Sequence, residues 1–90
     1  MKVTNMTSSK GNKVPNQFII QDDNGITEFQ SYETTIAQKN DNKSLPIKLD
    51  TKWQYSKTTS KYLYQFLGMK RNEIEAGIKS GSIIVTDLNK

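Results

Sequence analysis

Residues 53–68 read WQYSKTTSKYLYQFLG, and within this stretch the spacing of the apolar residues becomes that of a helix. The apolar side chains of residues 62–67 recur at i, i+1, i+4 and i+5, which places them along one stripe of an α-helix. Thr58 or Thr59 is a candidate N-cap, and Gly68 stands where a residue in the left-handed conformation commonly ends a helix. The stretch therefore predicts a short helix with one buried face.

A second short helix is predicted directly after the first. Asn72 is its candidate N-cap, with Glu75 three residues later, and Gly81 is its expected end. Ile74 and Ile78 are four residues apart and fall on one face of this helix, which we expect to be buried.

A β-hairpin is predicted nearer the start of the chain, where Asn24-Gly25 separates the runs FIIQD and TEFQ. Asn-Gly between two apolar runs favours a tight hairpin, because both residues tolerate positive φ. A two-residue loop at this dipeptide would place Ile20 opposite Phe29.

Three further segments have strand character. Leu45, Ile47 and Leu49 alternate with polar residues, which is typical of a half-buried strand. Pro46 cannot donate a ladder hydrogen bond, so this strand lies at an edge or Pro46 marks its start. Residues 31–38 fit a short helix or a strand, and their β-branched side chains favour a strand. Residues 83–85 predict a closing strand.

The resulting order, β-β-(β)-β-α-α-β, predicts an α+β fold. We expect a small antiparallel sheet of four or five strands with two short C-terminal helices packed on one face. Residues 1–16 are polar and show no apolar period, which favours a flexible arm. Residues 17–90 then form a single domain.

The composition excludes most kinds of catalytic centre, because the 90 residues include neither Cys nor His. Disulfides, thiolate metal sites and thiol nucleophiles all require Cys, and the commonest general base and zinc ligand is His. The turn at 22–25 also fails as a calcium loop, because Ile26 and Thr27 stand at the middle positions. We therefore expect no enzyme activity, no catalytic residue, no metal and no cofactor.

The first ten residues, MKVTNMTSSK, lack the apolar centre of a signal peptide. No run of apolar residues is long enough to span a bilayer. We expect a cytoplasmic protein without a membrane partner.

The net charge of +4 is unevenly distributed. Residues 39–71 include eight basic residues and two acidic ones, a local excess of six positive charges, and the only Trp with three of the four Tyr. A surface that is both basic and aromatic suits an anionic partner. The candidate partner-binding residues are Lys52, Tyr55, Lys57, Thr58, Lys61, Tyr64, Lys70 and Arg71.

Three motifs resemble those of a known group of proteins: FQSY at 29–32, YSKTTSKY at 55–62 and QFLG at 65–68. The chain is similar, over residues 16–89, to a family of short, functionally unassigned proteins encoded by phages and plasmids of Gram-positive bacteria. Members of that family have a YSxTTxKYxxQFL signature. The resemblance implies a mobile-element origin and brings no activity with it.

Two functions are favoured by these observations, and a third, a virion or assembly component, would predict stable higher-order oligomers. We expect an interaction protein that binds and inhibits a host or defence-system protein, itself one that handles nucleic acid. The alternative is a direct nucleic-acid-binding accessory protein, whose helices at Thr59–Gly68 and Asn72–Ser80 would form a helix-turn-helix-like pair. Glu73 and Glu75 disfavour that alternative, because they place negative charge where the second helix would meet DNA. The sequence leaves open the oligomeric state and whether Trp53 and Tyr55 are buried.

Overall fold

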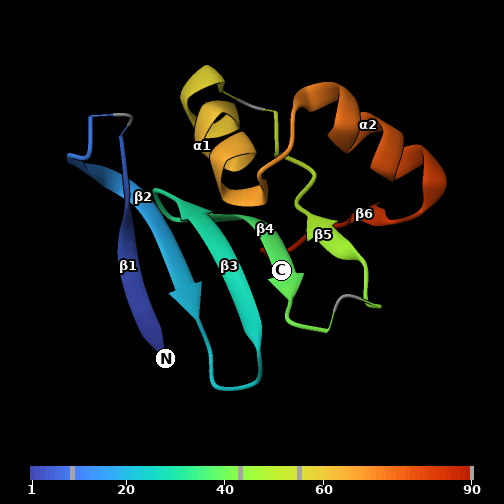
Figure 1. Ribbon diagram of the computed structural model, residues 1–90, viewed down its shortest axis with the longest axis horizontal. Helices are drawn as coiled ribbons and strands as arrows, with labels where there is room; N and C mark the ends of the chain where they lie inside the picture. Colours follow the sequence, from blue (N-terminus) through green and yellow to red (C-terminus); the bar gives the residue numbers. More distant parts are fainter. Residues whose placement is uncertain (9, 43, 55, 90) are drawn as a thin grey trace.

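The computed structural model describes residues 1–8, 10–42, 44–54 and 56–89. In these residues six strands form one sheet in the order β1-β2-β3-β4-β5-β6, and two helices lie on one face of it (Figure 1). Strands β1 to β5 are antiparallel neighbours, whereas β6 runs parallel to β5. A parallel pair needs a long crossover connection, and the two helices between β5 and β6 provide it. The elements are β1 (Lys2–Thr7), β2 (Lys13–Gln21), β3 (Ile26–Ser31), β4 (Thr34–Asn40), β5 (Ile47–Leu49), α1 (Lys57–Leu67), α2 (Arg71–Ser80) and β6 (Ile83–Val85).

The α+β class and the packing of both helices on one face are confirmed, but the sheet has more strands than predicted. The difference lies in residues 1–16, for which we expected a flexible arm. They form β1 and the start of β2 instead. Met6 is buried, and the side-chain amide of Gln65 on α1 donates to the carbonyl of Thr7 at 3.0 Å. An edge strand that buries one apolar residue leaves almost no hydrophobic period in the sequence.

The predicted hairpin forms, but its register differs by one residue. Ile19 pairs with Phe29, and Ile20 pairs with Glu28. The loop is longer than two residues because the Asp22 carboxylate accepts the backbone N–H groups of Asn24 and Ile26, at 2.8 and 3.0 Å. Since side chains alternate across a strand, this one-residue shift places Ile20 on the sheet face opposite the helices.

Strand β4 confirms the β-branched signal in residues 31–38 and contains a bulge. Phe29 pairs with Ala37 and Gln30 with Thr35, so that Ile36 is the extra residue. Ile36 and Ala37 are both buried.

Strand β5 lies between β4 and β6, and Pro46 directly precedes it, so Pro46 marks the start of a strand rather than an edge.

The N-caps of both helices lie two or three residues earlier than predicted. Helix α1 is capped by Ser56, whose Oγ accepts the N–H of Thr59 at 3.0 Å. At α2, Glu73 Oε1 accepts the backbone N–H of Lys70 at 3.0 Å, and Arg71 is the first helical residue. No described helix is long and apolar enough to cross a membrane.

The hydrophobic core lies between the sheet and the two helices. The Phe66 ring of α1 stacks on Phe29 of β3, with 5.7 Å between ring centroids. Trp53 is 7% exposed and belongs to this core, which answers one question that the sequence left open. The buried apolar residues are Met6, Phe29, Ile36, Ala37, Leu49, Trp53, Tyr62, Leu63, Phe66, Ile74 and Ile83.

A buried carboxylate ties the C-terminal residues to the sheet. Asp50 is 1% exposed, and its Oδ1 accepts the N–H of Leu88 at 2.8 Å and the side-chain amide of Asn89 at 3.0 Å. Its Oδ2 accepts the N–H of Lys52 at 3.0 Å. Burial acts to raise the pKa of Asp50, but these hydrogen bonds and the Lys52 charge outweigh it and hold the pKa below the ordinary 3.8.

Asp50→Ala should lower the free energy of unfolding at pH 7 by about 3 kcal/mol, because three donors lose their acceptor. Because the folded-state pKa is lowered, the carboxylate stabilises the fold above about pH 4 and this contribution is lost as the pH falls further. Urea unfolding between about pH 7 and pH 2.5 should therefore show a gap between wild type and Asp50→Asn that closes in acid. Glu33→Gln, in the exposed turn between β3 and β4, is the control, and a gap independent of pH would contradict the assignment.

A small polar cluster is buried beneath the start of α1. The hydroxyls of Ser31 and Thr59, both fully buried, lie 2.9 Å apart in a hydrogen bond. Gln17, 1% exposed, pairs with Ser31 in the β2–β3 ladder, and its Oε1 accepts no hydrogen bond from any described residue. The cluster therefore contains one hydrogen-bonded pair and one buried acceptor without a partner among the described residues.

Gln17→Met should leave the free energy of unfolding unchanged or raise it by up to about 1 kcal/mol, because a buried acceptor without a partner is removed at similar volume. Ser31→Ala should lower it by about 1–2 kcal/mol, because the Thr59 hydroxyl loses its partner. Urea unfolding of both variants measures the contrast. A larger loss for Gln17→Met than for Ser31→Ala would show that Oε1 is hydrogen-bonded in solution, for instance to a buried water.

Candidate basic groove

The solvent-facing side of α1 carries a polar stripe. Lys57, Ser60, Lys61 and Tyr64 occur at i, i+3, i+4 and i+7, which places them on one side of the helix. Thr59, Tyr62, Leu63 and Phe66 are buried on the other side. The burial of the apolar stripe thus determines which side chains α1 presents to solvent.

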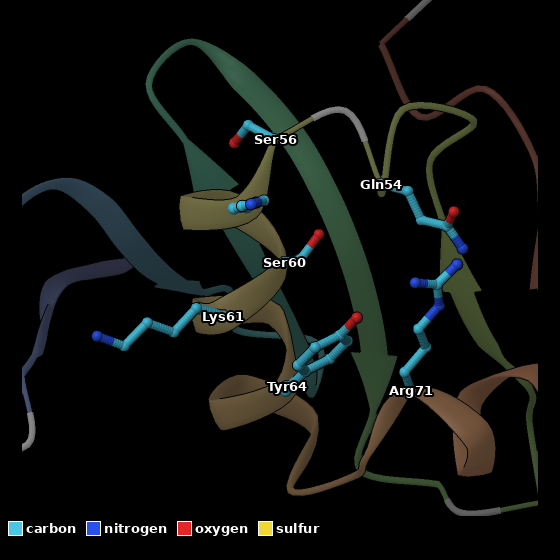
Figure 2. Close-up of a pocket in the computed structure, with 7 residues that line it drawn as sticks. Gln54, Ser56, Ser60, Lys61, Tyr64 and Arg71 are labelled. Atoms are coloured by element: carbon cyan, nitrogen blue, oxygen red, sulfur yellow. The ribbon is translucent and has the colours of Figure 1, made fainter.

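An open groove of about 520 Å³ runs between this stripe and the residues that flank the two helices (Figure 2). Ser60 and Tyr64 reach it from α1, Gln54 from the turn before α1, and Arg71 from the start of α2. Figure 2 shows the hydroxyls of Ser60 and Tyr64 on one side of the hollow and the side chains of Gln54 and Arg71 on the other. The lining residues are Gln54, Ser56, Lys57, Ser60, Lys61, Tyr64 and Arg71.

The short connection between the helices places Arg71 in the groove. Gly68 ends α1 with φ of 67°, in the left-handed region, and α2 begins three residues later. Arg71 Nε donates to Glu75 Oε1 at 3.1 Å, and the terminal nitrogens of the guanidinium donate to no described residue. The fork of the guanidinium is thereby oriented by its own helix, with its outer edge available to an anion.

Lys61 contributes to the groove differently from Arg71. Its side chain extends away from the hollow, toward the strands β1 and β2 (Figure 2), and its Nζ lies 5.5 Å from the centroid of the Tyr62 ring. Lys61 therefore lines the groove with its aliphatic stem and carries its charge onto the neighbouring surface.

The described residues that line the groove offer hydrogen-bond donors and positive charge but no negative charge. Among the described residues that line it, none carries a carboxylate, and all seven side chains can donate hydrogen bonds. The N-terminus of α1 adds the positive end of a helix dipole beside Ser56 and Lys57. Such a surface can bind carboxylate or phosphate groups.

The structure brings half of the candidate partner-binding residues together in this groove. Lys57, Lys61, Tyr64 and Arg71 line it, whereas Lys52, Thr58 and Lys70 are exposed on the surface outside it. Tyr55 lies outside the described residues. Gln54, Ser56 and Ser60 were not among the candidates; the spacing of Ser60 between Lys57 and Tyr64 could have indicated it, but nothing in the sequence indicates Gln54.

The described residues contain no group of three or more metal-ligating side chains that could hold an ion.

A family model matches residues 1–85 of the chain. The protein belongs to DUF8033, a family of unknown function. Neither a search of curated proteins nor a search of solved structures finds a match. Membership of the DUF8033 family thus agrees with the resemblance to a functionally unassigned family and adds no activity to it.

Proposed function

We propose that this DUF8033 protein is a non-enzymatic interaction protein of phage or plasmid origin. It acts in the host cytoplasm, where it binds and inhibits a host or defence-system protein, one that itself handles nucleic acid. Its basic groove receives an acidic segment of that partner. The observation that supports this proposal is the groove itself, which gathers the cationic side chains of Lys57 and Arg71, the aliphatic stem of Lys61 and several further donors, without one carboxylate among its described lining residues.

The partner's anionic groups are carboxylates rather than a continuous phosphate backbone. Glu73 and Glu75 are exposed on the first turns of α2, next to Arg71, and Glu75 accepts a hydrogen bond from it. A nucleic-acid backbone leaving the groove along α2 would meet these two carboxylates and be repelled. Discrete acidic side chains of a protein need contact only the groove.

Tyr64 is the expected anchor of the interface. It is half-buried, packs against the core from the polar stripe of α1, and directs its hydroxyl toward the hollow (Figure 2). A tyrosine held in this way loses little conformational entropy on binding and supplies both apolar area and a hydrogen bond.

Direct binding of nucleic acid is the second candidate, and the direction of Lys61 favours it. The ammonium group of Lys61 leaves the groove toward the β1–β2 hairpin, where Lys10 and Lys13 are exposed. Positive charge therefore continues from α1 toward the hairpin, as a backbone-binding surface would require.

Affinity capture from the lysate of a Gram-positive host, with the tagged protein as bait, tests the proposal. Tyr64→Ala and Arg71→Glu should each weaken binding of the captured protein at least about tenfold, since both remove interface anchors. Lys79→Glu, an equal change in charge at the far end of α2, should leave binding unchanged. Loss of binding with Lys79→Glu as well would indicate a non-specific charge effect.

Fluorescence anisotropy with labelled single- and double-stranded DNA, from about 50 to 300 mM salt, separates the second candidate. We expect no sub-micromolar affinity. If steeply salt-dependent binding does occur, and if Lys13→Glu with Lys61→Glu abolishes it and reduces the salt slope by about two, nucleic acid is the ligand and the proposal is wrong. These two lysines contribute little to the groove, so the same pair of changes should spare the captured protein.

A further inference from the structure

The face of the sheet that the helices leave uncovered has an ordered sequence of side chains across its strands. The ladder pairs Val3 with Ile20, Ile20 with Glu28, Glu28 with Gln38, Gln38 with Lys48, and Lys48 with Ile84. These six residues form one row across the whole sheet, each on a successive strand from β1 to β6. Because paired residues in a ladder point to the same side, all six project from the uncovered face.

The row is self-complementary about its centre. Gln38 on β4 is the midpoint of the row from β2 to β6, with Glu28 one strand away on one side and Lys48 one strand away on the other. Ile20 and Ile84 lie two strands away in opposite directions. Two copies can therefore pack face to face about a two-fold axis that runs parallel to β4. Glu28 of each copy would then lie opposite Lys48 of the other, and Ile20 of each copy opposite Ile84 of the other.

The same face exposes apolar area that a lone chain leaves in water. Val3 is 58% exposed and Ile84 42% exposed. Phe18, on the same face as Ile20, is only partly covered. Beside Lys48 the surface is hollowed by about 280 Å³, and half-exposed Leu45 lies at this hollow together with Ile26. Exposed apolar side chains that gather on one face mark an interaction surface.

The two charged side chains of this face, Glu28 and Lys48, are both free to form an ion pair with a partner. Lys48 is exposed and makes no ion pair with any described residue. Glu28 accepts a hydrogen bond at 3.2 Å from the side-chain amide of Gln38, which holds its carboxylate toward the centre of the row. Both charges can therefore meet a partner without breaking an ion pair in the described part of the chain.

We propose that the uncovered sheet face binds a second copy of this chain, forming a two-fold symmetric sandwich in which Glu28 of each copy meets Lys48 of the other. The helices and the basic groove then lie on the two outer sides, so the inference does not depend on the proposed function. The five strands from β2 to β6 span only about 19 Å at the usual strand spacing. An interface of this width is small, and we expect a dissociation constant on the order of 10 μM.

Sedimentation equilibrium of the full chain, at concentrations from about 1 to 300 μM around that constant, tests the proposal. Wild type should dimerise. Glu28→Lys and Lys48→Glu should each weaken dimerisation about tenfold or more, because each sets like charges against each other at two places. An equimolar mixture of the two variants should recover the wild-type constant. In the mixed dimer one chain is positive at both positions and the other is negative at both, so each of the two contacts again joins opposite charges.

The controls carry the same changes in charge elsewhere: Glu33→Lys in the β3–β4 turn and Lys79→Glu on α2 should dimerise as wild type does. A wild type that is still monomeric at about 300 μM, roughly thirty-fold above the expected constant, would overturn the proposal and leave the face to another kind of partner. A dimer that neither reversal weakens, or a mixture that does not recover, would show a different interface. Circular dichroism of each variant confirms that it is folded.

Discussion

The stacking of Phe66 on Phe29 is the contact on which the rest of the structure depends, because it fixes how α1 is rotated over β3. Lys39 reinforces it: its Nζ lies 4.4 Å from the centroid of the Phe66 ring and donates to the Phe66 carbonyl at 3.0 Å. Successive residues of a helix are about 100° apart, so anchoring Phe66 inward turns Lys57, Ser60 and Tyr64 outward. The polar stripe of the groove is thus a consequence of the core.

The groove also needs the second helix at a defined place. The Tyr64 carbonyl accepts the N–H groups of both Gly68 and Met69, at 2.8 and 3.2 Å, which closes α1 in a tight turn. Arg71 follows at once and meets the groove from the opposite side. On the far side of α2, a Cβ at Gly77 would lie 2.6 Å from Ile83 Cδ1, so the small residue allows α2 to approach β6 closely. The tight turn after α1 and the close packing of α2 on β6 together hold Arg71 in position.

The sheet divides the molecule into two surfaces of different chemistry. The helix side presents a concentrated positive groove, suited to an anionic partner, and the uncovered side presents opposite charges at symmetric positions between apolar residues. The division depends on the β2–β3 register. The Asp22 carboxylate extends the hairpin loop, and this sends Ile19 into the core and Ile20 to the outside. Had the loop been two residues long, Ile20 would pair with Phe29 on the core face, and Gln21 would replace Ile20 beside Glu28.

The sequence alone determined the elements whose signals are local: the helix at 57–67 from its apolar stripe, the second helix, the hairpin and the β-branched strand β4, and with them the α+β class. It also placed Lys57, Lys61, Tyr64 and Arg71 in one basic and aromatic stretch. Only the tertiary structure showed that residues 2–7 form a strand, that Gln54 faces Arg71, and that Lys61 turns away. These features depend on contacts between segments far apart in the chain, and an edge strand or a surface side chain gains too little from burial to leave a pattern in the sequence.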